Sequence, residues 1–173
     1  KEIEQRVANG GSPAFEDEQK ILAQYTGWGG LSDAFDPNKS AWSNEYSQLK
    51  AALSESEYEA ARSSTLTAFY TPATVIHPIY RALERFGVKG GKILEPSMGT
   101  GAFLAHGHFG SSDAKFYGVE LDSITGRISK QLYQKANIQV TGYENALLPD
   151  NYFDCVIGNV PFGNFQVNDP QYN

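Results

Sequence analysis

The sequence predicts an α/β fold, with a partial parallel sheet that follows an N-terminal helical extension. Four apolar runs are candidate strands, at 92–97, 115–121, 138–140 and 153–160. Stretches with helical spacing separate them, and strands that alternate with helices indicate parallel pairing. The run at 153–160 (FDCVIGNV) is largely apolar, which is typical of a strand buried in a parallel sheet. A glycine turn after the first run is the third observation.

The stretch from Lys92 to Leu104 (KILEPSMGTGAFL) joins the first strand to a helix through the turn Gly99-Thr100-Gly101. A turn between strand and helix presents backbone N–H groups at the carboxyl edge of the sheet, where α/β proteins bind ligands. Glycine allows the close approach and the positive φ that such a turn needs. The pattern fits both a ligand site and an ordinary tight connection, and other residues have to decide between them.

The extension is predicted to span residues 1–66. Ser12-Pro13 can begin a helix that is expected to end at Gly27. Residues 43–53 have apolar side chains at helical spacing, and Ser54-x-x-Glu57 is a capping-box pattern that begins another helix.

The glycine-rich loop that includes Trp28 follows the first of these helices. An aromatic side chain among glycines either fills a hydrophobic gap or contacts a ligand. Both interpretations stay open at this point.

The second region, 67–173, is predicted to hold the α/β domain and to stop after its fourth strand. Thr71 is a candidate N-cap and Pro72 a candidate first residue of a helix that ends at Gly87. After the second strand, Ile124, Ile128 and Leu132 mark one face of a further helix.

Composition limits the classes of protein. The 173 residues are 40% hydrophobic, enough for a core, and no apolar run approaches the roughly 20 residues of a membrane span. The single cysteine, Cys155, excludes an intramolecular disulfide and suits a reducing, cytoplasmic compartment. The net charge is −6 without a basic stripe, so strong nucleic-acid binding by this segment alone is not expected. Because Lys1 is not a methionine, we expect the chain to be part of a larger protein.

Two residues suggest specific binding chemistry. Glu120 follows Gly101 by about 20 residues and ends the next strand, where a carboxylate accepts hydrogen bonds from ribose hydroxyls. The alternative is a solvated carboxylate at a strand end. Asn159, in the sequence Asn159-Val160-Pro161-Phe162, ends an apolar strand before a proline and an aromatic ring. An amide oxygen, exposed carbonyls and a ring face can hold a planar base that bears an exocyclic amine.

These motifs together resemble the adenine-N6 DNA methyltransferases, which are amino-methyltransferases with an N-P-P-Y/F-type motif. The family's Y-T-P, E-P-S/A-x-G-x-G, G-V-E-x-D and N-P-P-F elements correspond to Tyr70–Pro72, Glu95–Gly101, Gly118–Asp122 and Asn159–Phe162. The order of the elements is similar to the gamma arrangement. The YTGWGGL sequence, which includes Trp28, also resembles large methyltransferase–helicase proteins of phages and conjugative elements.

The resemblance implies a Rossmann-like fold, S-adenosylmethionine as cofactor, and methyl transfer to the N6 amine of adenine in DNA. It assigns Asn159, Val160, Pro161 and Phe162 to the target base. It implies that DNA is recognised through regions beyond this chain, and it implies no metal. The implied cofactor-binding residues are Tyr70, Thr71, Glu95, Ser97, Gly99, Gly101, Glu120, Leu121, Glu144 and Asn145. Val160 departs from the proline that the family usually has there.

Three alternatives compete with this function. The acceptor could be a protein glutamine or an RNA base, because the Asn-x-Pro-aromatic pattern accepts any planar amide or amine. The chain could also be a non-catalytic cofactor-binding or scaffold module of a mobile-element protein. A nicotinamide oxidoreductase fits poorly, because Leu104 occupies the position of its third glycine. The fourth strand, 153–160, would also have an open edge, which favours self-association or cover by the N-terminal helices.

Overall fold

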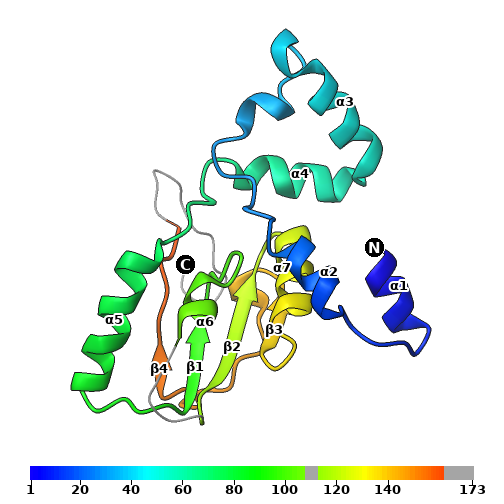
Figure 1. Ribbon diagram of the computed structural model, residues 1–173. Coiled ribbons are helices and arrows are strands. Elements are labelled where there is room, and N and C mark those ends of the chain that lie inside the picture. The colour runs from blue at the N-terminus through cyan, green and yellow to red at the C-terminus, as the bar shows by residue number, and fades with distance from the viewer. Residues whose placement is uncertain (108–112, 162–173) are drawn as a thin grey trace.

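The computed structural model describes residues 1–107 and 113–161, and its centre is a parallel sheet (Figure 1). The strand order is β3-β2-β1-β4, and each neighbouring pair is parallel. This arrangement confirms the α/β fold class and places the fourth strand beside the first. The strands are β1 (Lys92–Glu95), β2 (Lys115–Glu120), β3 (Asn137–Val140) and β4 (Cys155–Val156).

Three helices cover one face of the sheet: α5 (Ala73–Arg85), α6 (Ala102–His106) and α7 (Ser123–Leu132). Ile93 lies opposite Phe116 in the register, so both side chains are on the same face. Ile93 packs in a core with side chains of α5 and α6, and Phe116 packs against that core. Ile138 lies on this face too and packs with Leu104 of α6. The main core therefore lies between these helices and the sheet.

The opposite face is covered differently, by aromatic side chains from the segment before β4. Tyr117 on β2 makes edge-to-face contacts with Tyr152 and Phe153. Its hydroxyl is 2.9 Å from that of Tyr152, and the Lys92 ammonium lies 3.9 Å from the Tyr152 ring centroid. These contacts shield the centre of this face, whereas Val156 at its margin remains 60% exposed.

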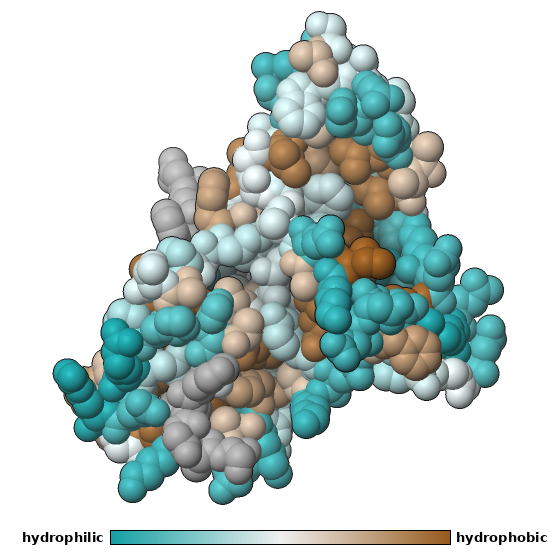
Figure 2. All heavy atoms as spheres, viewed as in Figure 1, coloured by the Kyte–Doolittle hydropathy of each residue, from teal (hydrophilic) through white to brown (hydrophobic). Residues whose placement is uncertain are grey.

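The N-terminal region is helical, as predicted, and part of it projects away from the sheet (Figure 1). A small separate core joins Ala34, Phe35, Tyr58 and Ala61, and Trp28 packs against it. Figure 2 shows hydrophobic side chains gathered where the projecting helices meet the rest of the molecule. The helices are α1 (Glu2–Ala8), α2 (Glu16–Leu22), α3 (Ser43–Ala52) and α4 (Glu55–Ser64), with short 3₁₀ turns η1 (Ser32–Phe35) and η2 (Ser40–Trp42).

Several predicted boundaries are wrong. Helix α2 begins after Phe15 rather than at Pro13, because the Glu18 side chain caps the Phe15 backbone, and it ends at Leu22, before Gly27. Pro72, not Thr71, is the N-cap of α5. Strand β4 is much shorter than 153–160, because its pairing with β1 joins only Cys155 and Val156 to Ile93 and Leu94.

The N-terminal helices pack on α7 and not on the edge formed by β4. Helices α2 and α4 both contact α7, at the other end of the helical layer (Figure 1). The prediction that they cover the β4 edge is therefore wrong for the described chain. Among the described residues, no helix is long and apolar enough to cross a membrane.

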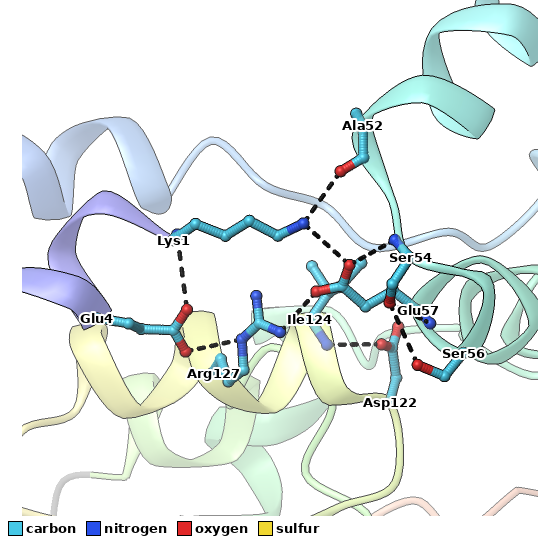
Figure 3. A network of polar contacts seen from close by, with 9 residues as sticks. All are labelled: Lys1, Glu4, Ala52, Ser54, Ser56, Glu57, Asp122, Ile124 and Arg127. Carbon is cyan, nitrogen blue, oxygen red and sulfur yellow. Dashed lines mark hydrogen bonds and ion pairs between the residues drawn. The ribbon is translucent and has the colours of Figure 1, made fainter. Parts of the chain in front are cut away.

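A network of charged side chains fixes α4 and α1 to α7 (Figure 3). Arg127 on α7 lies 2.8 Å from Glu57 on α4 and 2.8 Å from Glu4 on α1. Lys1 Nζ lies 3.1 Å from the second oxygen of Glu57. The Glu57 side chain is only 9% exposed, and the Arg127 contact is the largest of the effects that lower its pKa to about 2. This network makes Glu57 the main polar link between α4 and α7.

We predict that Glu57→Gln lowers the free energy of unfolding at pH 7 by about 1–3 kcal/mol, because a charged hydrogen-bond partner is lost. The folded pKa is about 2 and the ordinary value is 4.5, so this stabilisation is present above pH 4.5 and is lost as the pH falls toward 2. Urea unfolding at pH 7 and pH 3 should show a smaller difference between variant and wild type at pH 3.

Glu59→Gln is the matched control, because Glu59 pairs with Arg62 on the same helix and is 54% exposed. An exposed pair contributes little, so a change below about 0.5 kcal/mol is expected. Equal effects of the two substitutions would show that the Glu57 network does not fix α4 to α7.

Candidate functional site

The turn after β1 is the centre of the candidate site. Gly99 and Gly101 have φ values of 52° and 78°, in the left-handed region that favours glycine. A Cβ on Gly99 would lie 2.9 Å from Cδ1 of Tyr70, and one on Gly101 would lie 2.9 Å from Cζ of Tyr133. Two aromatic rings therefore lie directly against the turn, and conformation and space both require glycine there.

Glu120 holds this turn from the end of β2. Its Oε2 accepts a hydrogen bond from the Gly99 N–H at 2.7 Å, and its Oε1 accepts one from the Asp122 N–H at 2.7 Å. Burial raises the pKa of Glu120, and these backbone donors act against that rise. A carboxylate has about four lone-pair sites, so Glu120 can accept further hydrogen bonds.

Glu95 lies at the end of β1 and is the least satisfied polar side chain of the site. It is 3% exposed, and its Oε2 has no hydrogen-bond partner among the described residues. Burial raises its pKa well above 4.5, and the charge of Glu120 raises it further. A buried carboxyl group, Glu95, and a half-buried one, Glu120, thus lie beside the glycine turn and interact through their charges, and a cation is the ligand that would relieve both.

Tyr70 brings the segment before α5 into the site. Its ring lies against Gly99, and its pKa is raised to about 12 by burial and then by the charges of Glu120 and Asp122. Thr71 and Ser97, which the sequence also assigned to the site, are half-buried at the starts of α5 and of the turn.

A polar row on α7 also holds the turn, and the sequence pattern had pointed to a different face. Ser129 donates to the Gly99 carbonyl at 3.0 Å, and the Tyr133 hydroxyl donates to the Thr100 carbonyl at 3.0 Å. Ser129 and Thr125 are fully or almost fully buried, whereas the predicted inner residues Ile124, Ile128 and Leu132 are half-buried. The signal in the sequence is the spacing of Thr125, Ser129 and Tyr133, which are four residues apart.

The end of β4 lies beside the end of β1. A Cβ on Gly158 would lie 3.4 Å from Pro96 and 3.5 Å from Cγ of Glu95. The next residues, Asn159, Val160 and Pro161, are exposed and follow the strand without regular structure. Phe162 lies outside the described residues. The structure thus brings the asparagine of the predicted base-binding motif to the edge that carries the glycine turn.

The remaining predicted residues extend the site toward β3. Leu121 follows Glu120 and is 74% exposed. Glu144 and Asn145 belong to the 3₁₀ turn η3 (Tyr143–Asn145), just beyond β3, and Asn145 Nδ2 donates to Glu144 Oε1 at 2.8 Å. Because Val140 pairs with Glu120, this turn lies at the same edge of the sheet.

Residues 56–172 match the model of the N-6 DNA Methylase family, and the chain belongs to this family. It is 29% identical over 155 residues to defense against restriction protein B of Escherichia phage P1. This match covers 88% of this chain and 5% of that protein. It is also 33% identical over 95 residues to modification methylase CviBIII of Paramecium bursaria Chlorella virus NC1A. This second match covers 54% of this chain and 25% of that protein. The chain therefore spans a small part of both relatives.

Solved structures with a similar arrangement include methyltransferases. One is assigned as the modification subunit of a type I restriction enzyme from Vibrio vulnificus, with a TM-score of 0.45, 20% identity, and coverage of 71% of this chain and 28% of that one. Another is the plantazolicin methyltransferase BpumL in complex with SAH, with a TM-score of 0.44, 15% identity, and coverage of 85% and 52%.

We predict that Glu95→Gln changes how stability depends on pH. Because burial raises the folded pKa of Glu95, its contribution to stability is present below pH 4.5 and is lost as the pH rises toward that raised pKa. The neutral amide avoids this loss, so the variant should become progressively more stable relative to wild type as the pH rises from 4 to 8. Chemical unfolding across this range is the measurement.

Glu144→Gln is the control for the Glu95 experiment, because Glu144 is an exposed carboxylate at the same edge. As a substitution at an exposed position, it should change the free energy of unfolding by less than about 0.5 kcal/mol. A Glu95→Gln curve that runs parallel to that of wild type would contradict the buried, unpaired state of Glu95.

Proposed function

We propose that the protein transfers the methyl group of S-adenosylmethionine to the N6 amine of adenine in DNA. The observation that carries the proposal is the meeting of four features at one edge of the sheet. These are Glu95 with its unpaired oxygen, the Gly99–Gly101 turn, Glu120 and Asn159. Membership of the N-6 DNA Methylase family supports the same reaction.

The residues present fit the cofactor. The remaining acceptor sites of Glu120 suit the ribose hydroxyls, and the unpaired oxygen of Glu95 suits a positively charged ammonium or sulfonium. In this proposal Tyr70, Thr71 and Ser97 border the methionine end, with the turn beneath it. The adenine end lies toward the exposed Leu121 and toward Glu144 and Asn145. When bound, S-adenosylmethionine supplies an electrophilic methyl group on its sulfonium.

The end of β4 holds the target amine. Asn159 Oδ1 accepts one N–H of the amine and the Val160 carbonyl accepts the other, while Pro161 shapes the loop and Phe162 stacks on the base. Transfer would form a bond between the amine nitrogen and the methyl carbon and break the bond between that carbon and sulfur, so that S-adenosylhomocysteine leaves and the extra proton on nitrogen passes to water. Because the nitrogen would gain positive charge during the attack, both hydrogen bonds would strengthen. The exposure of Asn159 suits a base that enters from outside the protein after leaving the helix stack.

The proposal divides the chain into an extension at 1–66 and a catalytic region at 67–173. The net charge of −6 indicates that most contacts to DNA come from other parts of a longer protein. A relative encoded by a bacteriophage supports action in the bacterial cytoplasm.

A crossed experiment tests these roles. Asn159→Ala should lower the rate of methyl transfer roughly a hundredfold or more, because a preorganised transition-state partner is lost. Its affinity for S-adenosylhomocysteine should stay within about threefold of wild type, which is less than 1 kcal/mol. Glu120→Ala, in contrast, should weaken the affinity for S-adenosylhomocysteine about tenfold or more. Single-turnover transfer of tritiated methyl groups to an adenine-containing duplex and calorimetry are the measurements.

If Asn159→Ala transfers methyl groups at the wild-type rate, the Asn-Val-Pro stretch has no catalytic role and is only a turn after β4. Equal cofactor affinity in Glu120→Ala and wild type would remove Glu120 from the site. Transfer to a glutamine peptide or to RNA, with none to DNA, would keep the fold and cofactor but replace the substrate.

Among the described residues, no strand pairs with the outer side of β4, and we propose that self-association covers this edge. Val156 is 60% exposed on this edge, and an apolar edge strand favours pairing with another chain. Val156→Lys should shift the sedimentation equilibrium toward monomer. Val75→Lys, at a 47% exposed valine of α5, should leave it unchanged. A monomeric wild type would contradict the proposal.

A further inference from the structure

The loop that includes Trp28 lies against the candidate site, although it is far from it in the sequence. Gly27 has a φ of +78°, and a Cβ there would lie 2.5 Å from Cε2 of Tyr70. Gly99, in the turn after β1, lies equally close to the same ring, since a Cβ there would be 2.9 Å from Cδ1 of Tyr70. The Tyr70 ring is therefore held between two glycines, one from the N-terminal region and one from the turn.

A chain of hydrogen bonds links the same loop to Glu120. The Tyr25 hydroxyl is 2.8 Å from Oγ1 of Thr125, and Thr125 donates to Oδ2 of Asp122 at 2.9 Å. The Asp122 N–H in turn donates to Glu120. Both groups that the loop reaches, Tyr70 and Glu120, lie against the glycine turn.

The loop is itself anchored on both sides. Trp28 makes edge-to-face contacts with Tyr25 and Phe35, at 5.8 and 5.6 Å between ring centroids. The Gly30 N–H donates to the Thr65 carbonyl at 3.1 Å. These contacts give the loop a fixed position from which it can hold Tyr70.

We propose that residues 25–28 are a positioning element of the cofactor site, which fixes the Tyr70 ring over the Gly99 turn. The N-terminal region thereby sets the affinity for S-adenosylmethionine, without contacting it through Gly27. The inference rests on the proposed function, because it assigns a second part of the chain to the same site.

Gly27→Ala tests the inference, and Gly30→Ala is its matched control. Gly30 has a φ of +76°, so alanine suffers the same backbone strain there, but no atom lies within 4 Å of its Cβ position. Alanine at Gly27 displaces the Tyr70 ring. Titration calorimetry with S-adenosylhomocysteine should show binding at least about tenfold weaker in Gly27→Ala than in Gly30→Ala, which corresponds to about 1.4 kcal/mol.

The Tyr70→Ala background shows whether the effect passes through the ring. Once the ring is absent, Gly27→Ala should change the affinity by less than about twofold relative to Tyr70→Ala alone. A further tenfold loss in that background would mean that Gly27 acts by another route, and it would overturn the inference.

Thermal unfolding of each variant shows whether it is folded. If Gly27→Ala does not fold, Tyr25→Phe decides, with Tyr46→Phe in the small core of the N-terminal region as control. Loss of the Tyr25 hydroxyl should weaken binding about threefold or more, and the Tyr46 change should not. Equal affinities in the paired variants would overturn the inference, whereas a wild type that binds no S-adenosylhomocysteine would overturn the proposed function instead.

Discussion

The backbone of the Gly99–Gly101 turn has polar groups that must be paired, and this requirement organises the structure around it. An unpaired buried backbone group costs about as much as a lost hydrogen bond. Glu120 accepts from the Gly99 N–H, and Ser129 and Tyr133 donate to the carbonyls of Gly99 and Thr100. The end of β2 and the inner side of α7 are therefore held where the turn needs them. The same pairing places the Glu120 carboxylate at the edge that receives a ligand.

Helix α7 also carries the N-terminal region on its other side, and it does so with polar contacts. Gln131 accepts from the Ala14 N–H at 3.0 Å, Gln19 donates to the Gln131 carbonyl at 2.7 Å, and Arg127 pairs with Glu57. One helix thus joins the glycine turn to the extension. The proposed boundary near residue 66 does not separate the groups that surround Tyr70, because Gly27 and Gly99 both lie against its ring.

The parts of the fold that depend on local patterns could be predicted from the sequence. The four strands, their parallel pairing and the capping box of α4 follow from residue spacing within short windows. The polar row on α7 and the pairing of Tyr70 with Gly27 could not be predicted, because they depend on contacts between segments far apart in the chain. Ile124 and Ile128 lie on one face of α7, as their spacing indicates, but the side chains that pair with the glycine turn come from the adjacent polar row. For the site, the sequence identified the side chains at the strand ends but not what holds them there.

The hydrogen bond between Gly30 and Thr65 has a consequence for how this architecture can vary. It closes the base of an excursion from residue 31 to residue 64, whose outer part projects from the molecule (Figure 1). Lengthening a flexible excursion with closed ends costs only about 0.6 kcal/mol for each doubling of its length. Helix α4 is constrained by Arg127, and Phe35 is buried in the small core, so tolerance of insertions and deletions concentrates in the exposed stretch at 37–41. Insertions and deletions in this segment can therefore change its length while the glycine turn and Tyr70 keep their geometry.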